Sequence, residues 1–308
     1  MSLSGGATST ASNNWANVWH KILGAIWDNQ GVEDEPLHHM YLDQITTDKK
    51  YFDDVEFVGT DLWHRTGEGE DLDLGTYGQG IVTRYEPIKF SKRLVIPEEL
   101  EEDSQYDIVY DATRVLRQAE TLTEDYDAVG LLNDAASTAN GRVGGDGKAM
   151  CDASHPIRGG ATVSNILPYA LAPSNTAMGV MLVMIEKMPS PEGYVTRSLK
   201  ATKVVGPTEY KWRMREIWKS EKKDDTANNA VNALKGELSE DYVGVPFMAS
   251  KTNWFVKTNA KRGAQFVMRR PPRLRNTSSN VNETKVATGS ARWVVGWSNF
   301  RGYVMSQI

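Results

Sequence analysis

The stretch GDGKAMCDASHPIRGG, residues 145–160, places a thiol, a carboxylate, a hydroxyl and an imidazole within five positions of one another. These groups serve nucleophilic catalysis when an imidazole or a helix N-terminus stabilises the thiolate. The partners in such sites normally come from distant segments, and the proline after His155 favours extended backbone. The glycines of the stretch favour a flexible turn. We therefore interpret Cys151 and His155 as loop residues and expect no catalytic residue here.

No other motif nominates a catalytic, cofactor or metal site. The sequence contains no P-loop, no dinucleotide-binding glycine motif and no metalloprotease helix motif. His38 and His39 are adjacent, so they point in different directions in most backbones, and we interpret them as loop residues. The acidic run at residues 68–73 lacks the residue order of an EF-hand loop. We expect no metal, no cofactor and no enzymatic activity.

Composition indicates a globular chain of one or two domains. The 308 residues are 40% hydrophobic and 24% charged, and the single cysteine excludes an intrachain disulfide. The polar first fourteen residues lack the order of a secretory signal. The longest apolar run, residues 177–185, is about half as long as a bilayer-spanning helix. We expect a reducing compartment and no membrane association.

Charge is distributed unevenly along the chain. Residues 251–308 contain eleven Lys and Arg and one acid, whereas the first 250 residues contain 24 basic and 39 acidic residues. Such a basic end favours self-association with the acidic part or contact with nucleic acid, and solvated surface is the plain alternative. Its strand-like sequence holds no recognition helix or base-stacking motif, so we expect no sequence-specific DNA site. We select Arg269, Arg270 and Arg273 as candidate contact residues.

An amphipathic helix is predicted after a disordered lead of about fourteen residues. Trp15, Trp19 and Trp27 fall on one stripe with the aliphatic residues between them. Either the core of the same subunit or a neighbouring subunit covers this stripe. We expect the arm to matter more for assembly than for folding.

Residues 55–96 read as one long antiparallel hairpin with an acidic tip. Two strand-like segments flank a turn-rich stretch that is too narrow to have a core on both faces. The hairpin must therefore lie on another surface. Its tip carries four candidate contact residues: Glu68, Glu70, Asp71 and Asp73.

A single long helix is predicted over residues 105–138, about 50 Å at 1.5 Å per residue. Its apolar residues follow at spacings of four and three: Ile108, Ala112, Val115, Ala119, Leu122, Tyr126 and Val129. Fewer than four heptads and several small residues favour packing of this seam on a sheet over a coiled coil. A buried helix at 174–188, a strand at 201–206 and a helix from Pro207 then indicate an α/β subdomain, and strands end the chain.

This order of elements resembles the major capsid protein of tailed bacteriophages of the Hong Kong 97 type. GDGKAMCDASHP is similar to the loop after the spine helix in Mu-like major head subunits, and NWFVKTN, AQFVMRRPP and ARWVVGWSNFRGYV resemble the terminal strands of the family. The resemblance covers residues 50–308. It implies an α+β fold with an N-terminal arm, an extended β-hairpin (the E-loop), a spine helix, a peripheral sheet and an axial α/β subdomain.

The resemblance also implies a domain layout and a function. The layout is an arm at 1–50, the hairpin at 51–100, a peripheral domain at 101–159 and 246–308, and an axial domain at 160–245. The function is an icosahedral shell of hexamers and pentamers around double-stranded DNA, contacted non-specifically, in a virion whose proteins are made in the host cytoplasm. Scaffold, portal and cement proteins are the other expected partners, and no scaffold-like coiled coil precedes the fold.

The hairpin departs from the family in one respect. Residues 53–86 contain no lysine, so the covalent crosslink that some members form through the hairpin is not expected. The implied contact is instead electrostatic, between the acidic tip and cations of an adjacent subunit. The alternatives are a nucleic-acid-binding protein that uses the basic end and an unrecognised enzyme, and both should remain small in solution whereas a shell subunit should form very large particles or rings.

Overall fold

The computed structural model describes residues 10–60, 62–72, 74–97, 106–158, 160–195, 198–221, 231–279 and 284–307. The chain forms two compact units, neither of which is continuous in sequence. Unit 1 consists of Met1–Pro36, Ile88–Asp125 and Met268–Trp293, and unit 2 of Leu37–Pro87, Tyr126–Val267 and Val294–Ile308.

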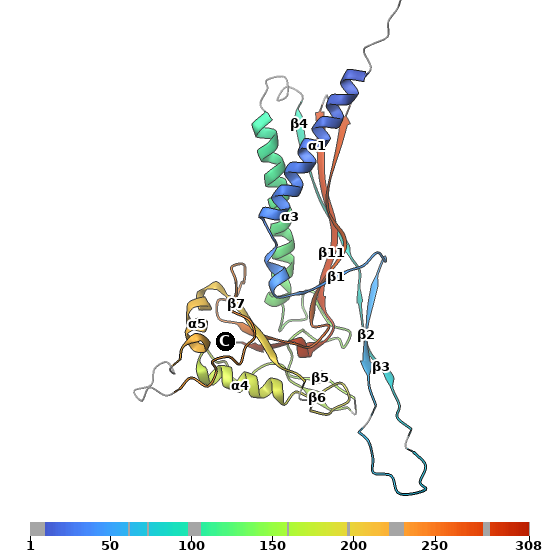
Figure 1. Ribbon diagram of the computed structural model, residues 1–308, viewed down its shortest axis with the longest axis vertical. Helices are drawn as coiled ribbons and strands as arrows, with labels where there is room; N and C mark the ends of the chain where they lie inside the picture. The colour runs from blue at the N-terminus through green and yellow to red at the C-terminus, as the bar shows by residue number, and fades with distance from the viewer. Residues whose placement is uncertain are drawn as a thin grey trace, which may run out of the picture. The chain divides into compact units, whose positions relative to one another are not determined.

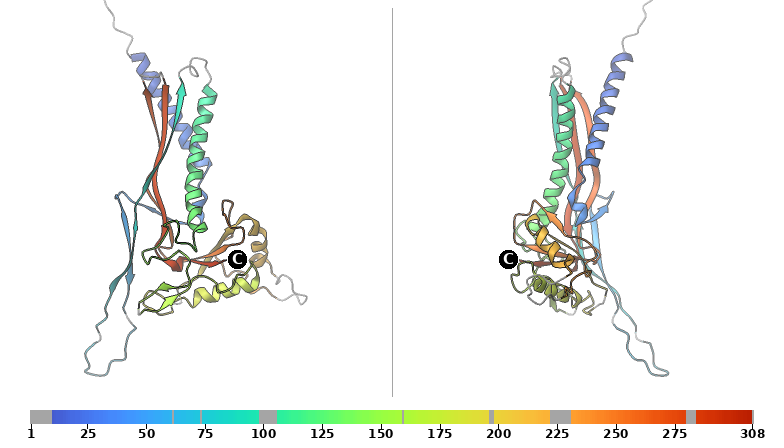
Figure 2. Two further views of the ribbon diagram at one scale, coloured as in Figure 1. Left: turned by 180° about the vertical axis from the view of Figure 1, so that it is seen from behind. Right: turned by 60° about the vertical axis from the view of Figure 1, so that its left-hand side comes forward.

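Unit 1 packs two helices on a β-sheet. The helices are α1 (Thr10–Glu33) and the first part of α3 (Tyr106–Asn133), and the strands are β4 (Ile88–Pro97) with parts of β10 (Ala264–Ser279) and β11 (Thr284–Trp297). The strand order is β10-β11-β4, and β11 pairs antiparallel with β4 from Thr284↔Pro97 to Trp293↔Ile88. Figures 1 and 2 show α1 and α3 running beside these strands.

Gly289 explains how both helices reach the same face of the sheet. A Cβ at this position would lie 2.8 Å from the Trp27 ring of α1 and 3.8 Å from the Leu116 side chain of α3. Without a side chain, β11 lets the Trp27 indole lie directly on its backbone. Beside this contact, Leu23, Ile96 and Val109 form a buried apolar cluster. Unit 1 is therefore held by apolar side chains from both helices and the sheet.

The buried face of α3 is not the seam that the sequence suggested. Ile108, Val115 and Leu122 are 53%, 60% and 45% exposed, whereas Val109 and Leu116 are buried. Periodicity identifies residues that share a face but does not say which face is inward. Buried polar residues add to the ambiguity, because Thr113 satisfies its hydroxyl by donating to the Val109 carbonyl at 2.9 Å. The expectation that this seam packs on the sheet is wrong for Ile108, Val115 and Leu122, and α3 also ends at Asn133 rather than near 138.

Unit 2 contains a four-stranded sheet flanked by short helices. Its strands are β7 (Ala201–Pro207), β8 (Val243–Val245), β9 (Trp254–Thr258) and β12 (Tyr303–Ser306), in the order β12-β9-β7-β8 with β8 parallel to β7. The helices are α4 (Asn175–Glu186), η2 (Thr208–Tyr210) and α5 (Lys211–Lys219). The three segments predicted to form one terminal sheet are thus divided, since β9 and β12 lie here whereas β10 and β11 pair elsewhere.

The expected long hairpin is shorter than predicted. β2 (Phe52–Val58) pairs antiparallel with β3 (Gly78–Tyr85), but the next strand, β4, pairs with β11. Pro87 separates β3 from β4, and a proline cannot donate a ladder hydrogen bond. The prediction of one hairpin extending to residue 96 is therefore wrong, and the boundary between the units falls at this proline.

The remaining elements of unit 2 are short: η1 (Leu37–Met40), β1 (Asp43–Thr46), β5 (His155–Pro156), β6 (Thr162–Val163) and η3 (Phe300–Gly302). His38 was expected in a loop, yet it lies in η1, is fully buried and stacks on Phe266 with ring centroids 4.0 Å apart. The helix α1 also begins earlier than expected, at Thr10, within the lead predicted to be disordered. The burial of His38 reflects tertiary packing against Phe266, which local sequence does not encode.

Candidate subunit-contact surfaces

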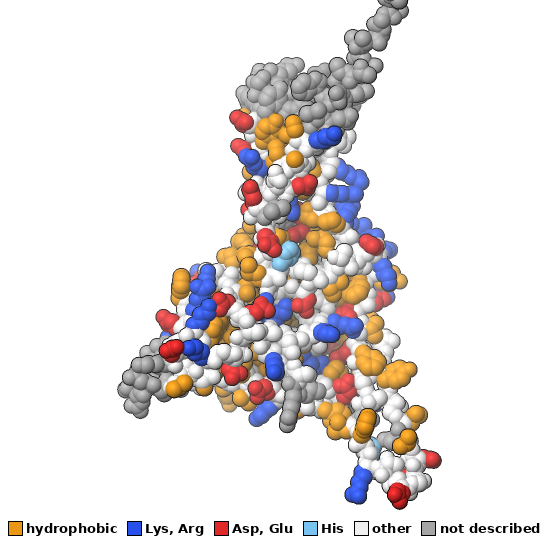
Figure 3. All heavy atoms as spheres, viewed as in Figure 1, with side chains coloured by type: hydrophobic (Ala, Val, Ile, Leu, Met, Phe, Trp, Pro, Cys, Tyr) orange, Lys and Arg blue, Asp and Glu red, His pale blue; other side chains and the backbone are white. Residues whose placement is uncertain are grey.

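The loop between β2 and β3 exposes large apolar side chains. The exposed fractions are 62% for Leu62, 98% for Trp63, 85% for Leu72, 85% for Leu74 and 77% for Tyr77. Figure 3 shows hydrophobic side chains gathered along this hairpin. A soluble monomer rarely exposes so many large apolar residues in one segment, so the loop is a candidate contact surface. Only the acids of this loop were predicted as contact residues, although its leucines and its tryptophan are visible in the sequence.

The acids of the tip do not all have the same role. The Glu70 carboxylate accepts a hydrogen bond from the Gly67 amide at 2.9 Å, so it closes the turn at the tip. Glu68 and Asp71 are exposed. Asp73 lies outside the described residues. Of the three predicted contact residues that the structure describes, Glu68 and Asp71 are therefore best suited to meet a partner.

Polar contacts hold the base of the hairpin to the rest of unit 2. Asp54 and Glu56 share one face of β2, two residues apart. The Gln265 amide donates to Asp54 at 3.0 Å, and Arg301 pairs with Glu56 at 3.3 Å. One residue beyond β2, the Gly59 amide donates to the Glu192 carboxylate at 2.6 Å. These contacts fix the direction in which the hairpin leaves unit 2.

Arg301 is the central residue of this network. Its side chain is 6% exposed, its Nε donates to the Pro189 carbonyl at 2.7 Å, and its guanidinium lies 4.4 Å from the centroid of the Phe300 ring. Burial lowers the pKa of Arg301, and the carboxylates of Glu56 and Glu192 act in the opposite direction. The buried cation therefore depends on these carboxylates for compensation.

A basic surface covers the strands of unit 1. Residues 88–97, 268–279 and 284–293 contain no acid and nine cations: Lys89, Lys92, Arg93, Arg269, Arg270, Arg273, Arg275, Lys285 and Arg292. Burial and repulsion from neighbouring arginines, Arg273 and Arg292 first among them, lower the pKa of Arg270. Among the described residues, the buried Nε atoms of Arg270, Arg273 and Arg292 have no hydrogen-bond partner. The predicted trio thus belongs to a larger set of cations on strands that contain no acid.

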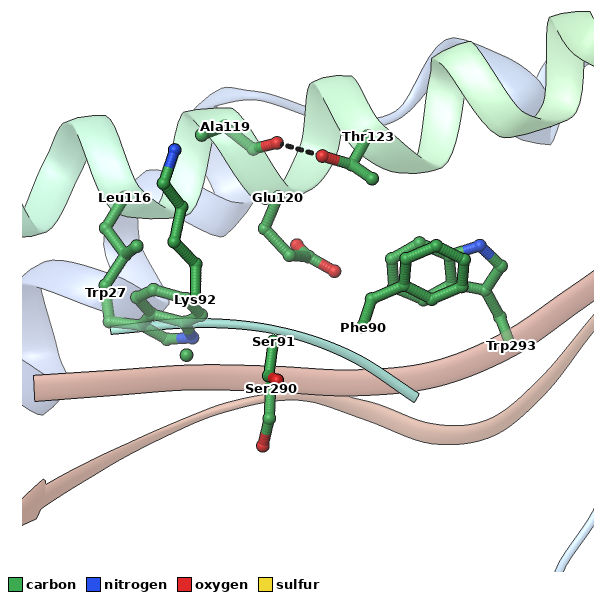
Figure 4. Close-up of a pocket in the computed structure, with 11 residues that line it drawn as sticks. Trp27, Phe90, Ser91, Lys92, Leu116, Ala119, Glu120, Thr123, Ser290 and Trp293 are labelled. Carbon is green, nitrogen blue, oxygen red and sulfur yellow. Dashed lines mark hydrogen bonds between the residues drawn. The ribbon is translucent and has the colours of Figure 1, made fainter. Parts of the chain in front are cut away.

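Part of this cluster lies on the sheet face that the helices leave open. The Arg270 guanidinium donates to the Ser290 hydroxyl at 3.0 Å, and Figure 4 shows the Ser290 side chain pointing away from α3. Lys and Arg side chains also gather beside the strands of unit 1 in Figure 3. Because like charges repel, this surface is suited to a negatively charged partner.

The opposite face of the sheet holds a cavity of about 180 Å³ beneath α3 (Figure 4). Phe90 and Trp293 stack at one side with centroids 4.0 Å apart and an interplanar angle of 5°. The Glu120 carboxylate lies above the strands and forms an ion pair with Arg117. The walls are largely aromatic and aliphatic, so the cavity is a packing gap between helix and sheet.

The tryptophans of the arm fall into two groups. Trp27 is 3% exposed and packs within unit 1, and the Arg117 guanidinium lies 5.5 Å from the centroid of its ring. Trp27 is therefore covered by the core of its own subunit and not by a neighbouring subunit. Trp15 and Trp19 lie on α1, but their side chains are outside the described part, and their role in subunit contacts stays a prediction.

The Cys151 segment is packed rather than poised for chemistry. Cys151 is 1% exposed, and burial raises the pKa of its thiol, which disfavours the nucleophilic thiolate. The fully buried His155 ring contacts the Asp146 carboxylate through Nδ1 at 2.7 Å and stacks on Phe300 at 4.2 Å. The Ser154 hydroxyl donates to Asp152 at 2.8 Å. The thiol is therefore buried, and the imidazole, the carboxylate and the hydroxyl each have a structural partner.

Neither a metal site nor a membrane segment is found in the part of the chain that the structure describes. No three His, Cys, Asp or Glu side chains come together there in a way that could hold an ion. Its helices are also too short or too polar to cross a bilayer.

The chain is similar in fold to solved structures of phages and of a capsid. The chain is similar to the Microbacterium phage Oxtober96 structure, with a TM-score of 0.56, 8% identity, and coverage of 88% of this chain and 90% of that one. For the Mycobacterium phage Patience structure the TM-score is 0.55 and the identity 11%, with coverage of 92% of this chain and 88% of that one. For the capsid of an empty GTA particle the TM-score is 0.52 and the identity 12%, with coverage of 87% of each chain. These comparisons confirm the predicted α+β fold of Hong Kong 97-type capsid subunits.

The sequence itself gives the family. The profile described as phage capsid protein matches residues 80–306, most of the chain, and the chain belongs to this family. None of the curated protein sequences matches it significantly. The protein is a capsid shell protein of tailed bacteriophage type, and the alternative of a nucleic-acid-binding protein has no support from these comparisons.

Proposed function

We propose that copies of this chain assemble into a closed icosahedral shell of hexamers and pentamers that encloses double-stranded DNA, and that the β2–β3 loop binds a neighbouring copy. The exposed apolar loop carries this proposal, because Trp63, Leu72 and Leu74 are almost fully exposed on a single subunit. Burying large apolar side chains of this kind is the main favourable term in most protein association.

Charge supports the same contact. The tip presents Glu68 and Asp71, and the strands of unit 1 carry eight cations and no acid among the residues whose side chains the structure describes. A tip seated on the basic surface of a second copy would bring opposite charges together beside the apolar contact. High salt should then weaken the shell, because exposed charges are screened.

Several finer expectations belong to this proposal. They are the peripheral and axial domain layout, the virion location after synthesis in the host cytoplasm, non-specific contact with packaged DNA, and additional scaffold, portal and cement proteins. The protein has a structural rather than an enzymatic role, which fits the packed Cys151 segment.

Particle formation by the purified protein tests the proposal. We expect the wild type to sediment as large particles or rings that are visible by negative-stain microscopy. Trp63→Ser combined with Leu72→Ser should leave the unassembled subunit folded, since both residues are exposed, but should abolish closed particles. Thr66→Ser, at an exposed polar position of the same loop, is the control.

Charge reversal separates the electrostatic part. Glu68→Lys with Asp71→Lys should also prevent assembly while leaving the subunit's circular dichroism unchanged. A wild type that stays monomeric under all conditions would refute the shell proposal. A double serine variant that forms normal particles would refute the role of the loop.

A further inference from the structure

The chain contains one Asn-Gly pair, Asn140–Gly141, and it lies in the turn that follows α3. Both residues are exposed, and Gly141 has a φ of 70°, in the left-handed region that glycine adopts without strain. A Cβ at Gly141 would meet no described atom within 4 Å, and the Gly141 amide donates only a long hydrogen bond of 3.4 Å, to the Thr138 carbonyl. The pair is therefore open to water, and its backbone nitrogen is weakly held.

An asparagine in such a pair can react with the backbone nitrogen that follows it. The Gly141 nitrogen loses its proton and attacks Cγ of Asn140, so that the N–Cγ bond forms, the Cγ–Nδ2 bond breaks and the side-chain nitrogen leaves as ammonia with the proton. Water then opens the five-membered succinimide at one of its carbonyls, which leaves aspartate or isoaspartate. Because glycine has no side chain to shield its nitrogen, this pair is the asparagine site best suited to the reaction.

The Asn140 amide also holds a specific place in the structure. Its Nδ2 donates to the Asp134 carboxylate at 2.6 Å. Arg142 pairs with the same carboxylate at 3.4 Å and with the Asp127 carboxylate at 2.8 Å. One guanidinium thus serves two acids, and Asn140 contributes the neutral donor. Loss of the amide removes this donor and sets a new carboxylate against Asp134, where the two like charges repel.

The affected turn holds neighbouring parts of unit 2 in place. Arg142 also donates to the Asp127 carbonyl at 2.7 Å, so the segment after the turn is tied back to α3. The Cys151 amide donates to the Ala135 carbonyl at 2.7 Å, which ties the Cys151 segment to the residues just after the helix. A repulsive charge in the turn therefore acts on the contact between α3 and the segment that follows it.

We propose that Asn140 is a deamidation site of the folded protein, and that the carboxylate formed there weakens the end of α3 through repulsion with Asp134. This inference goes beyond shell formation and does not depend on it, because every group involved belongs to one subunit. In the proposed shell, the modified residue would accumulate with the age of the particle.

Hydroxylamine, which cleaves succinimides, tests the first step. The native wild-type subunit should give the fragments 1–140 and 141–308 at mildly alkaline pH. Asn140→Gln should stay intact, because its longer side chain would have to close a six-membered ring. Cleavage of the wild type only after unfolding in urea would show that the fold protects the pair, and that result overturns the proposal.

Peptide mapping by mass spectrometry measures the products without a trapping reagent. Aspartate and isoaspartate should form at Asn140 about tenfold faster than at Asn259, because alanine follows Asn259 and shields the attacking nitrogen. Asn259 is the internal control, since it is also exposed and its amide also donates a hydrogen bond, to the Ser198 carbonyl at 2.7 Å. The rate at Asn140 should rise with pH, because the attacking nitrogen must lose its proton. Equal rates at the two asparagines overturn the assignment.

The structural consequence has its own measurement in the unassembled subunit. Asn140→Asp should lower the urea midpoint, and Asp134→Asn in the same chain should recover most of the loss, because it removes the facing charge. Ala139→Asp is the matched control: it adds the same charge at the neighbouring exposed position and should unfold like the wild type. Equal midpoints for Asn140→Asp and Ala139→Asp refute the repulsion.

These outcomes are separate from those of the shell proposal. If the wild type forms particles but its Asn140 stays unmodified, the shell stands and the deamidation site is wrong. If the wild type forms no particles, the shell proposal fails, and cleavage by hydroxylamine in the native subunit still decides the site.

Discussion

Removal of the Arg301 guanidinium should weaken the base of the hairpin more than any other single charge change there. Arg301→Met keeps the aliphatic stem and removes the charge. The substitution leaves the Glu56 carboxylate without its cation and the Pro189 carbonyl without its donor. Both groups lie in unit 2, which contains the hairpin.

The structure sets the size of the effect. Breaking a buried ion pair by removing one partner costs about 3 to 5 kcal/mol of unfolding free energy. The Glu56 side chain is 23% exposed and can regain some hydration, so we expect a loss near the lower limit, about 3 kcal/mol. Glu56→Gln in the same chain removes the orphaned charge and should restore about 1 to 2 kcal/mol.

Urea unfolding of the unassembled subunit, followed by circular dichroism, measures these changes. Arg84→Met is the matched control, because Arg84 pairs with Asp53 on the same hairpin at 2.7 Å but is 57% exposed. An exposed pair contributes little, so this variant should unfold close to the wild type. The reasoning is refuted if Arg301→Met and Arg84→Met have the same midpoint and slope.

Two further predictions concern packing. Trp27→Ala should lower the unfolding free energy by about 3 to 5 kcal/mol, because it removes a buried indole from the sheet. Ile22→Ala on the same helix is the control and should lower the unfolding free energy much less. Equal losses would contradict the assignment of Trp27 to the core. Cys151 should not react with a maleimide in the native subunit and should react fully in urea, and rapid native labelling would show that the thiol is accessible.

The Trp27 prediction replaces the expectation that the arm matters mainly for assembly. Deletion of residues 1–30 would remove both Leu23 and Trp27 from the core of unit 1. The stripe on α1 was evident in the sequence, but a stripe alone does not tell whether its cover belongs to the same subunit.

Local pattern was sufficient for the type and approximate position of the regular elements. The helices α3, α4 and α5 and the strand β7 lie where periodicity and end signals placed them. On α4, Ser174 accepts a hydrogen bond from the Ala177 amide at 3.1 Å, a cap that depends only on residues close in sequence. The excess of eleven cations over one acid in residues 251–308 was also countable from the sequence.

Tertiary structure decided which strands pair and which faces are buried. β4 follows β3 after two residues, yet it pairs with β11, almost two hundred residues away, because strand pairing depends on the whole sheet. The heptad of α3 was recognised correctly, but Val115 faces solvent while Thr113 is buried. A periodic pattern defines a face, and only the surfaces available to cover it determine whether that face turns inward.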